Sequence, residues 1–219
     1  MNRDIILFDL DGTVTDPKEG ITRSVAYALA HFGIQVEDMD TLTNFIGPPL
    51  VDSFMEHCGA TREQAVEMVE LYRERYVPIG LFENAAAEGA AEMLKRLKEK
   101  GYKTALASSK PEVMCEKVCE YFGFTPYLDV IGGSPLHGDY TKADVIRDAM
   151  ARLGLTADRA GEILMVGDRK YDVLGAAECG IACVGLTLFG YAEEGELENA
   201  GAVDLVGTME ELEAYILNH

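Results

Sequence analysis

The order of apolar and polar residues divides the chain into three parts. Ile5–Phe8 is a short apolar run typical of a buried strand, and it leads directly into two aspartates. Residues 17–84 have helical periodicity and no convincing strand. From Ala85 onward, helical and strand patterns alternate, which predicts βαβ units that build a parallel sheet covered by helices. The sequence therefore predicts an α/β fold with a helical insertion after the first strand.

Glycines and capping residues set the limits of the predicted helices. Gly33, Gly59 and Gly101 each end a helical pattern, and Thr61 with Gln64 forms a capping box that begins another. The predicted helices cover residues 19–32, 49–58, 61–77, 86–100, 111–122, 141–153, 171–179 and 209–217. The predicted strands cover residues 5–8, 103–107, 128–131, 163–166 and 182–186, with a last strand near residue 205.

Polar clusters follow three of the predicted strands. They are Asp9 with Asp11, the segment 108–110, and the segment 167–172. In open parallel sheets, ligands bind beyond the carboxyl ends of the strands. We therefore expect the three clusters to converge at one edge of the sheet.

The first cluster places two carboxylates close together. Alternation along a strand puts Asp9 and Asp11 on the same side, where their repulsion is costly unless a cation or a shared proton compensates. Gly12 suits a sharp turn at this point. Taken alone, however, the pattern fits equally well a strand that ends in a polar turn made by Asp11 and Gly12.

Composition and charge narrow the possible functions. The chain has 219 residues, of which 48% are hydrophobic, as expected of a globular protein. Its net charge of −19 argues against nucleic acid as a partner, because phosphate backbones are bound by Lys and Arg. A small phosphorylated metabolite is compatible with this charge if a divalent metal neutralises the site locally.

The absence of membrane, signal-peptide and paired-cysteine patterns predicts where the protein is located and the state of its cysteines. No apolar run is long enough to cross a bilayer and the N-terminus does not resemble a signal peptide, so we expect a cytoplasmic protein without a membrane partner. The five cysteines form no C-x-x-C pair and should be buried thiols. His31, His57 and His137 are expected to be structural or exposed. The oligomeric state, monomer or weak dimer, is not encoded in any pattern we recognise.

The three clusters could together transfer a phosphoryl group. A carboxylate such as Asp9 can attack phosphorus, and a second one, Asp11, can protonate the leaving oxygen and later activate water. Magnesium would be held directly by Asp9 and Asp168, by the backbone carbonyl of Asp11, and by Asp172 through a water molecule. Ser108 and Lys142 would hold the remaining phosphate oxygens.

These residues resemble the motifs of the haloacid dehalogenase-like phosphatases over nearly the whole chain. The matching positions are Asp9-Leu10-Asp11-Gly12-Thr13, Ser108, Lys142, and Gly167-Asp168 with Asp172. The resemblance implies a Rossmann-like core of residues 1–15 and 85–219 with a helical cap of residues 16–84. It also implies that Asp9 is the nucleophile, Asp11 the acid/base and Mg²⁺ the cofactor, as reasoned above.

Weaker local features resemble the phosphoglycolate phosphatases and related bacterial 5′-nucleotidases. They are segments 46–50, 109–111 and 188–191. Candidate substrate-binding residues are Gly12, Thr13, Ser109, Lys110, Gly47 and Pro48. The chain departs from phosphoglycolate phosphatases where it has Phe189-Gly190-Tyr191 and where Lys142 is not followed by Pro, so the substrate stays open.

Several alternatives remain at this point. Ser109 could replace Ser108 as the phosphate-binding hydroxyl, and Lys110 competes with the favoured Lys142, although Lys110 could instead face solvent or substrate. The loop at residues 44–50 could contact substrate or only turn the chain. A phosphomutase of the β-phosphoglucomutase type would use the same aspartates, and a phosphate-ester binding protein without turnover is a third interpretation.

Overall fold

The computed structural model describes residues 3–136 and 140–219, so His137 lies outside the described residues. The chain divides into two compact units. One contains the residues up to Thr15 together with Ala86–His219, and the other contains Asp16–Ala85. Within the described ranges, no helix is both long and apolar enough to cross a membrane.

A six-stranded sheet forms the centre of the larger unit. Its order is β5 (Val130–Ser134), β4 (Lys103–Pro111), β1 (Ile5–Phe8), β6 (Ile163–Gly167), β7 (Ala182–Leu186) and β8 (Asp204–Val206), and neighbouring strands are parallel. Strand β1 lies inside the sheet, between β4 and β6, and is buried along its whole length. The predicted parallel α/β sheet is thus confirmed, and its inner strand is the apolar run that precedes Asp9.

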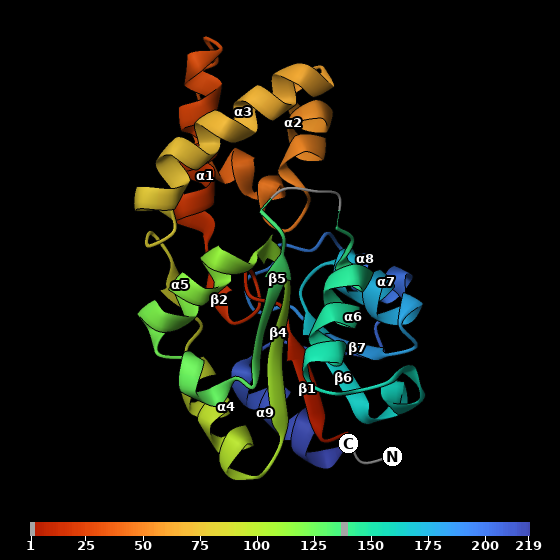
Figure 1. Cartoon of the computed structure of the whole chain (residues 1–219). Coiled ribbons are helices and arrows are strands. Elements are labelled where there is room, and N and C mark those ends of the chain that lie inside the picture. The colour runs from red at the N-terminus through yellow and green to blue at the C-terminus, as the bar shows by residue number, and fades with distance from the viewer. Residues whose placement is uncertain (1–2, 137–139) are drawn as a thin grey trace. The chain divides into compact units, whose positions relative to one another are not determined.

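Helices cover both faces of this sheet (Figure 1). Ile5 and Leu7 point to one face and pack in a core with residues of α6 (Lys142–Arg152) and α7 (Lys170–Glu178). Helices α4 (Ala90–Glu99) and α5 (Glu112–Phe122) pack against β4 on the other side, as right-handed crossovers require. Helices α8 (Glu196–Ala200) and α9 (Met209–Asn218) complete the unit, with 3-10 turns at Thr125–Tyr127 and Ala157–Glu162.

The smaller unit is helical, as predicted. It contains α1 (Lys18–His31), a 3-10 segment (Met39–Phe45), α2 (Leu50–Cys58), α3 (Arg62–Arg75) and a π-helical turn (Tyr76–Gly80). Its core includes Phe45 and Phe54, whose ring centroids lie 5.0 Å apart. The capping box is confirmed, since the Gln64 N–H donates to Thr61 Oγ1 at 3.3 Å and the Thr61 N–H donates to Gln64 Oε1 at 3.0 Å.

Several predicted boundaries were wrong, and one of them matters for the site. Residues 85–86 form a short strand, β3 (Ala85–Ala86), paired with β2 (Thr15–Asp16), so α4 begins only at Ala90. Strand β4 does not end at Ala107 but continues to Pro111, with a shift in register between Ser108 and Pro111. This irregularity carries the second polar cluster.

Candidate active site

The nucleophile candidate Asp9 directly follows the inner strand. Its N–H donates to the carbonyl of Val166 at 2.9 Å, which ties it to the end of β6. The side chain is buried, with 7% of the residue exposed. Because β1 has parallel neighbours on both sides, the ends of β4 and β6 bring their own polar residues to the same edge.

The turn after Asp9 is shaped around the carboxylate of Asp168, the residue that follows β6. Gly12 has φ +81°, and a Cβ at this position would lie 2.2 Å from Asp168 Oδ2. The Thr13 hydroxyl donates to Asp168 Oδ1 at 3.0 Å. Gly12 and Thr13 therefore contact the Asp168 carboxylate, and their contact with substrate stays a prediction.

Three buried carboxylates meet at this edge. One carboxylate oxygen from each of Asp9, Asp168 and Asp172 lies within 4.8 Å of the other two. Burial, together with the charges of Asp172 and Asp9, raises the pKa of Asp168 well above its usual value. Burial also raises the pKa of Asp172 to about 6, against the opposing charge of Lys142. Such a concentration of negative charge is costly without a cation.

The predicted phosphate-binding lysine lies against two of these carboxylates. Lys142 begins α6, and its Nζ lies 2.6 Å from Asp172 Oδ1 and 3.1 Å from Asp9 Oδ1. Burial by itself lowers the pKa of Lys142, but the charges of Asp172 and Asp9 outweigh it and raise that pKa, so the side chain is an ammonium. Gly175 permits this position, because a Cβ there would lie 2.8 Å from the Lys142 Cβ.

The second polar cluster separates into buried and exposed side chains. Ser108 and Lys110 are buried, whereas Ser109 between them is exposed. The Ser108 Oγ accepts a hydrogen bond from the Lys110 N–H at 3.3 Å. Along this irregular end of β4, Ser108 and Lys110 thus point inward and Ser109 points outward.

Lys110 does not face solvent, which was one of the predicted alternatives. Its Nζ lies 2.5 Å from Asp11 Oδ2. The other oxygen of Asp11, Oδ1, is buried and has no hydrogen-bond partner among the described residues. Burial raises the pKa of Asp11, although the neighbouring Lys110 charge lowers it in part.

Gly47 and Pro48 belong to the other unit. They lie in the loop between the 3-10 segment and α2, where Gly47 has φ +102°. Their contact with substrate stays a prediction.

The ion pair of Arg169 and Glu196, like that of Lys110 and Asp11, was not predicted from the sequence. Arg169, next to Asp168, is buried and forms an ion pair with Glu196, with 2.9 Å between Arg169 Nε and Glu196 Oε1. Glu196 lies 27 residues later in the chain, and no periodic or motif signal links the two.

Comparison with known proteins finds a family model and several relatives that match this chain. A family model described as haloacid dehalogenase-like hydrolase matches residues 6–186. The chain is 45% identical to a 5′-nucleotidase of Pseudomonas aeruginosa over 193 residues, covering 88% of this chain and 86% of that protein. It is 35% identical to the tyrosine-protein kinase PtkA of Mycobacterium tuberculosis, covering 82% of this chain and 60% of the kinase.

A solved structure is similar to this chain over its full length. The crystal structure of a predicted phosphatase from Clostridium acetobutylicum matches with a TM-score of 0.94 and 42% identity, and each chain is covered completely.

Proposed function

Because the chain belongs to the haloacid dehalogenase-like hydrolase family, we propose that it is a phosphatase that hydrolyses a small phosphate monoester with Mg²⁺ as cofactor. The observation that carries this proposal is the meeting of Asp9, Asp168 and Asp172 within 4.8 Å, with the Lys142 ammonium against two of them. A carboxylate and a phosphate ester are both anions, so they can react at this site only if positive charge is supplied there.

The residues present fit a magnesium ion. Asp168 Oδ2 is buried without a hydrogen-bond partner among the described residues, and the surrounding donors are carboxylate oxygens, which Mg²⁺ prefers. Asp9 and Asp168 would hold the ion directly, with the backbone carbonyl of Asp11, and Asp172 through water. When bound, magnesium supplies positive charge that lets the anionic carboxylate and phosphate approach each other.

The reaction would proceed in two displacements at phosphorus. An Asp9 carboxylate oxygen attacks phosphorus, the bond from phosphorus to the ester oxygen breaks, and Asp11 gives its proton to the leaving oxygen. Asp11, now ionised, then takes a proton from water. That water attacks the phosphorus of the aspartyl phosphate, which releases inorganic phosphate and restores both aspartates.

The environment of Asp11 suits this role. Burial raises its pKa, which favours the protonated form needed in the first displacement. The Lys110 ammonium counteracts this effect and favours the ionised form needed in the second. Ser108 and Lys142 would bind phosphate oxygens during both displacements.

The 45% identity to a 5′-nucleotidase makes nucleoside 5′-monophosphates the first substrates to test. Phosphoglycolate is the second, because the sequence resembles phosphoglycolate phosphatases in three short segments. Inorganic phosphate formed in proportion to substrate consumed supports a hydrolase, whereas an isomeric sugar phosphate without free phosphate supports the mutase alternative.

The test is a screen of phosphorylated metabolites with Mg²⁺, with released phosphate as the readout and Asp9→Asn as the matched inactive variant. We expect at least one small phosphate ester to be hydrolysed by the wild type and not by the variant. A wild-type protein that releases no phosphate from any ester would overturn the proposal, whereas an equally active variant would overturn the role of Asp9 in it. Incubation with ATP and a tyrosine-containing peptide, with phosphotyrosine on the peptide as the readout, tests separately for the tyrosine kinase activity named for PtkA.

A further inference from the structure

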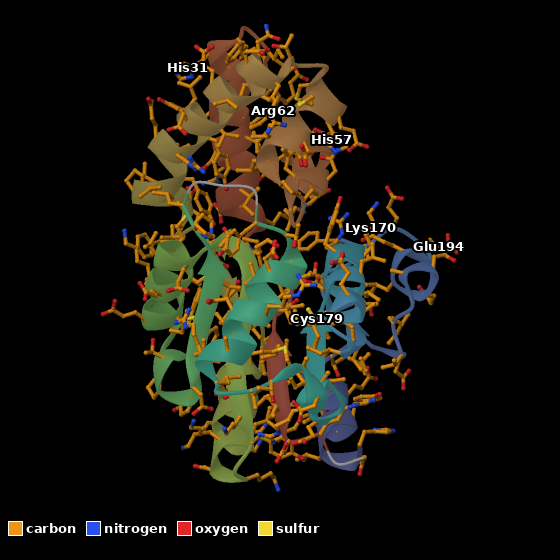
Figure 2. The ribbon with its side chains drawn as sticks, turned by 45° about the vertical axis from the view of Figure 1, so that its right-hand side comes forward. His31, His57, Arg62, Lys170, Cys179 and Glu194 are labelled. Carbon is orange, nitrogen blue, oxygen red and sulfur yellow. The ribbon has the colours of Figure 1, made fainter. Side chains whose placement is uncertain are left out.

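A buried carboxylate outside the catalytic set holds the start of α7. Glu196 begins α8, and 5% of its side chain is exposed. Its Oε1 accepts hydrogen bonds from Arg169 Nε at 2.9 Å and from the Lys170 N–H at 2.8 Å. Its Oε2 accepts from Arg169 Nη2 at 3.3 Å and from the Glu193 N–H at 3.2 Å. Figure 2 labels Lys170, where α7 begins, and Glu194, just before α8.

The segment that Glu196 holds joins two of the proposed metal carboxylates. Arg169 and Lys170 lie between Asp168 and Asp172 in the chain. The Arg169 N–H donates to Asp172 Oδ2 at 3.0 Å, and the Asp172 N–H donates to the Arg169 carbonyl at 3.0 Å. Glu196 thus fixes the side chain of Arg169, and the backbone of Arg169 in turn fixes the Asp172 carboxylate.

The ion pair of Glu196 and Arg169 is suited to fix the positions of side chains rather than to stabilise the fold. Burial alone would raise the pKa of Glu196, but hydrogen bonds from Arg169, Lys170 and Glu193 hold that pKa below its usual value, so the carboxylate is charged. Desolvation offsets much of the attraction within a buried ion pair. The two contacts from Arg169 nevertheless fix the direction of the guanidinium, as a bidentate pair does.

We propose that Glu196 is a positioning residue for the metal site, which acts through Arg169 and Lys170 to set the separation of the Asp168 and Asp172 carboxylates. The inference rests on the proposed function, since it assumes that these carboxylates bind Mg²⁺. Residues that orient metal ligands without touching the metal commonly contribute 10- to 100-fold to metal affinity.

The test measures Mg²⁺ binding to the full-length protein by titration calorimetry, without substrate. We expect Glu196→Gln to weaken Mg²⁺ affinity roughly 10- to 100-fold, because the neutral amide cannot accept all four hydrogen bonds. We also expect kcat to return close to the wild-type value when Mg²⁺ is raised far above the new dissociation constant, with little change in substrate KM.

The chain offers a matched control. Glu213 forms a bidentate pair with Arg96, in which Arg96 Nε lies 2.7 Å from Glu213 Oε1 and Arg96 Nη2 lies 2.5 Å from Glu213 Oε2. This pair joins α4 to α9 and includes no residue of the proposed site. Glu213→Gln should therefore lower the melting temperature without changing Mg²⁺ affinity.

Two results would overturn the inference. If wild type binds Mg²⁺ and folded Glu196→Gln binds it within about twofold of wild type, Glu196 has no positioning role. If wild type binds no Mg²⁺, the proposed function fails and the inference fails with it. Should Glu196→Gln not fold, Arg169→Lys replaces it, because it keeps the charge but loses the two-point contact, and the same loss of affinity is expected.

Discussion

The ammonium of Lys110 lies 2.5 Å from the Asp11 carboxylate, although the two residues are 99 positions apart. Both side chains are largely buried, with 6% of Lys110 and 13% of Asp11 exposed. An ion pair at the proposed acid/base would give Lys110 a specific part in the proposed reaction. It would orient the Asp11 carboxylate and, by lowering its pKa, would set how readily that carboxylate gives up its proton.

Replacing Lys110 should therefore slow turnover. We expect Lys110→Met to lower kcat roughly 10- to 100-fold, as partial loss of acid–base catalysis does. Lys110 lowers the pKa of Asp11, so its removal raises that pKa, and the limb of the rate profile that needs ionised Asp11 should move to higher pH. Lys103→Met, an exposed lysine on the same strand, is the control and should leave the profile unchanged.

Removing the proposed nucleophile should abolish phosphate release. We expect Asp9→Asn to lower kcat by at least about 1,000-fold, because an amide oxygen is a poor nucleophile. Its circular dichroism spectrum should match that of wild type. Asp204→Asn, an exposed aspartate in the same unit, should keep full activity. Near-normal turnover by Asp9→Asn would disprove the assignment of the nucleophile.

Magnesium should stabilise the protein in the absence of substrate. The ion would relieve repulsion among Asp9, Asp168 and Asp172, and a ligand at 100 times its dissociation constant adds about 2.7 kcal/mol to the free energy of unfolding. We expect the melting temperature to rise with Mg²⁺ and to fall again with EDTA. Asp168→Asn should reduce this response strongly, and an unchanged response in that variant would contradict the assigned ligand.

Gly12→Ala should displace the Asp168 carboxylate by direct contact. A Cβ at Gly12 would lie 2.2 Å from Asp168 Oδ2, and the positive φ adds about 1 kcal/mol of strain. Gly101→Ala separates the two effects, because Gly101 also has a positive φ but a Cβ there would meet no atom within 4 Å. We expect both variants to be less stable, measured by urea denaturation, and only Gly12→Ala to lose Mg²⁺ affinity.

The smaller unit should lose stability in acid through Glu83. Hydrogen bonds from Arg75, at 2.7 and 2.9 Å, hold the pKa of Glu83 below its usual value. A carboxylate with a lowered folded-state pKa stabilises the fold above its unfolded-state pKa, and this contribution is lost as pH falls through the folded-state value.

We therefore expect Glu83→Gln to lower the free energy of unfolding by about 1 kcal/mol at pH 7 and by much less at pH 3. The measurement is urea denaturation at both pH values. Glu70→Gln, which removes an exposed ion pair with Arg73, should change stability little at either pH. A loss at Glu83 that is equal at both pH values would rule out the charge as its cause.

The sheet and much of the site could be predicted because both depend on local patterns. A fully buried run such as Ile5–Phe8 predicts an inner strand, and parallel strands carry their following residues to one edge. This rule alone predicts that Asp9 and Asp168 lie close together. Helix limits were also local, set by features such as the capping box at Thr61 and Gln64.

Tertiary structure alone decided which charges are paired. Lys110 meets Asp11 because β4 continues past Ala107, and Glu196 meets Arg169 because α8 packs beside α7. Periodicity reports whether a position is buried within its own element, but the partner of a buried charge depends on which distant segment comes within a few ångströms. The sequence by itself thus determined the fold class and the carboxylates of the site, and the packing of distant segments determined how those carboxylates are held and balanced.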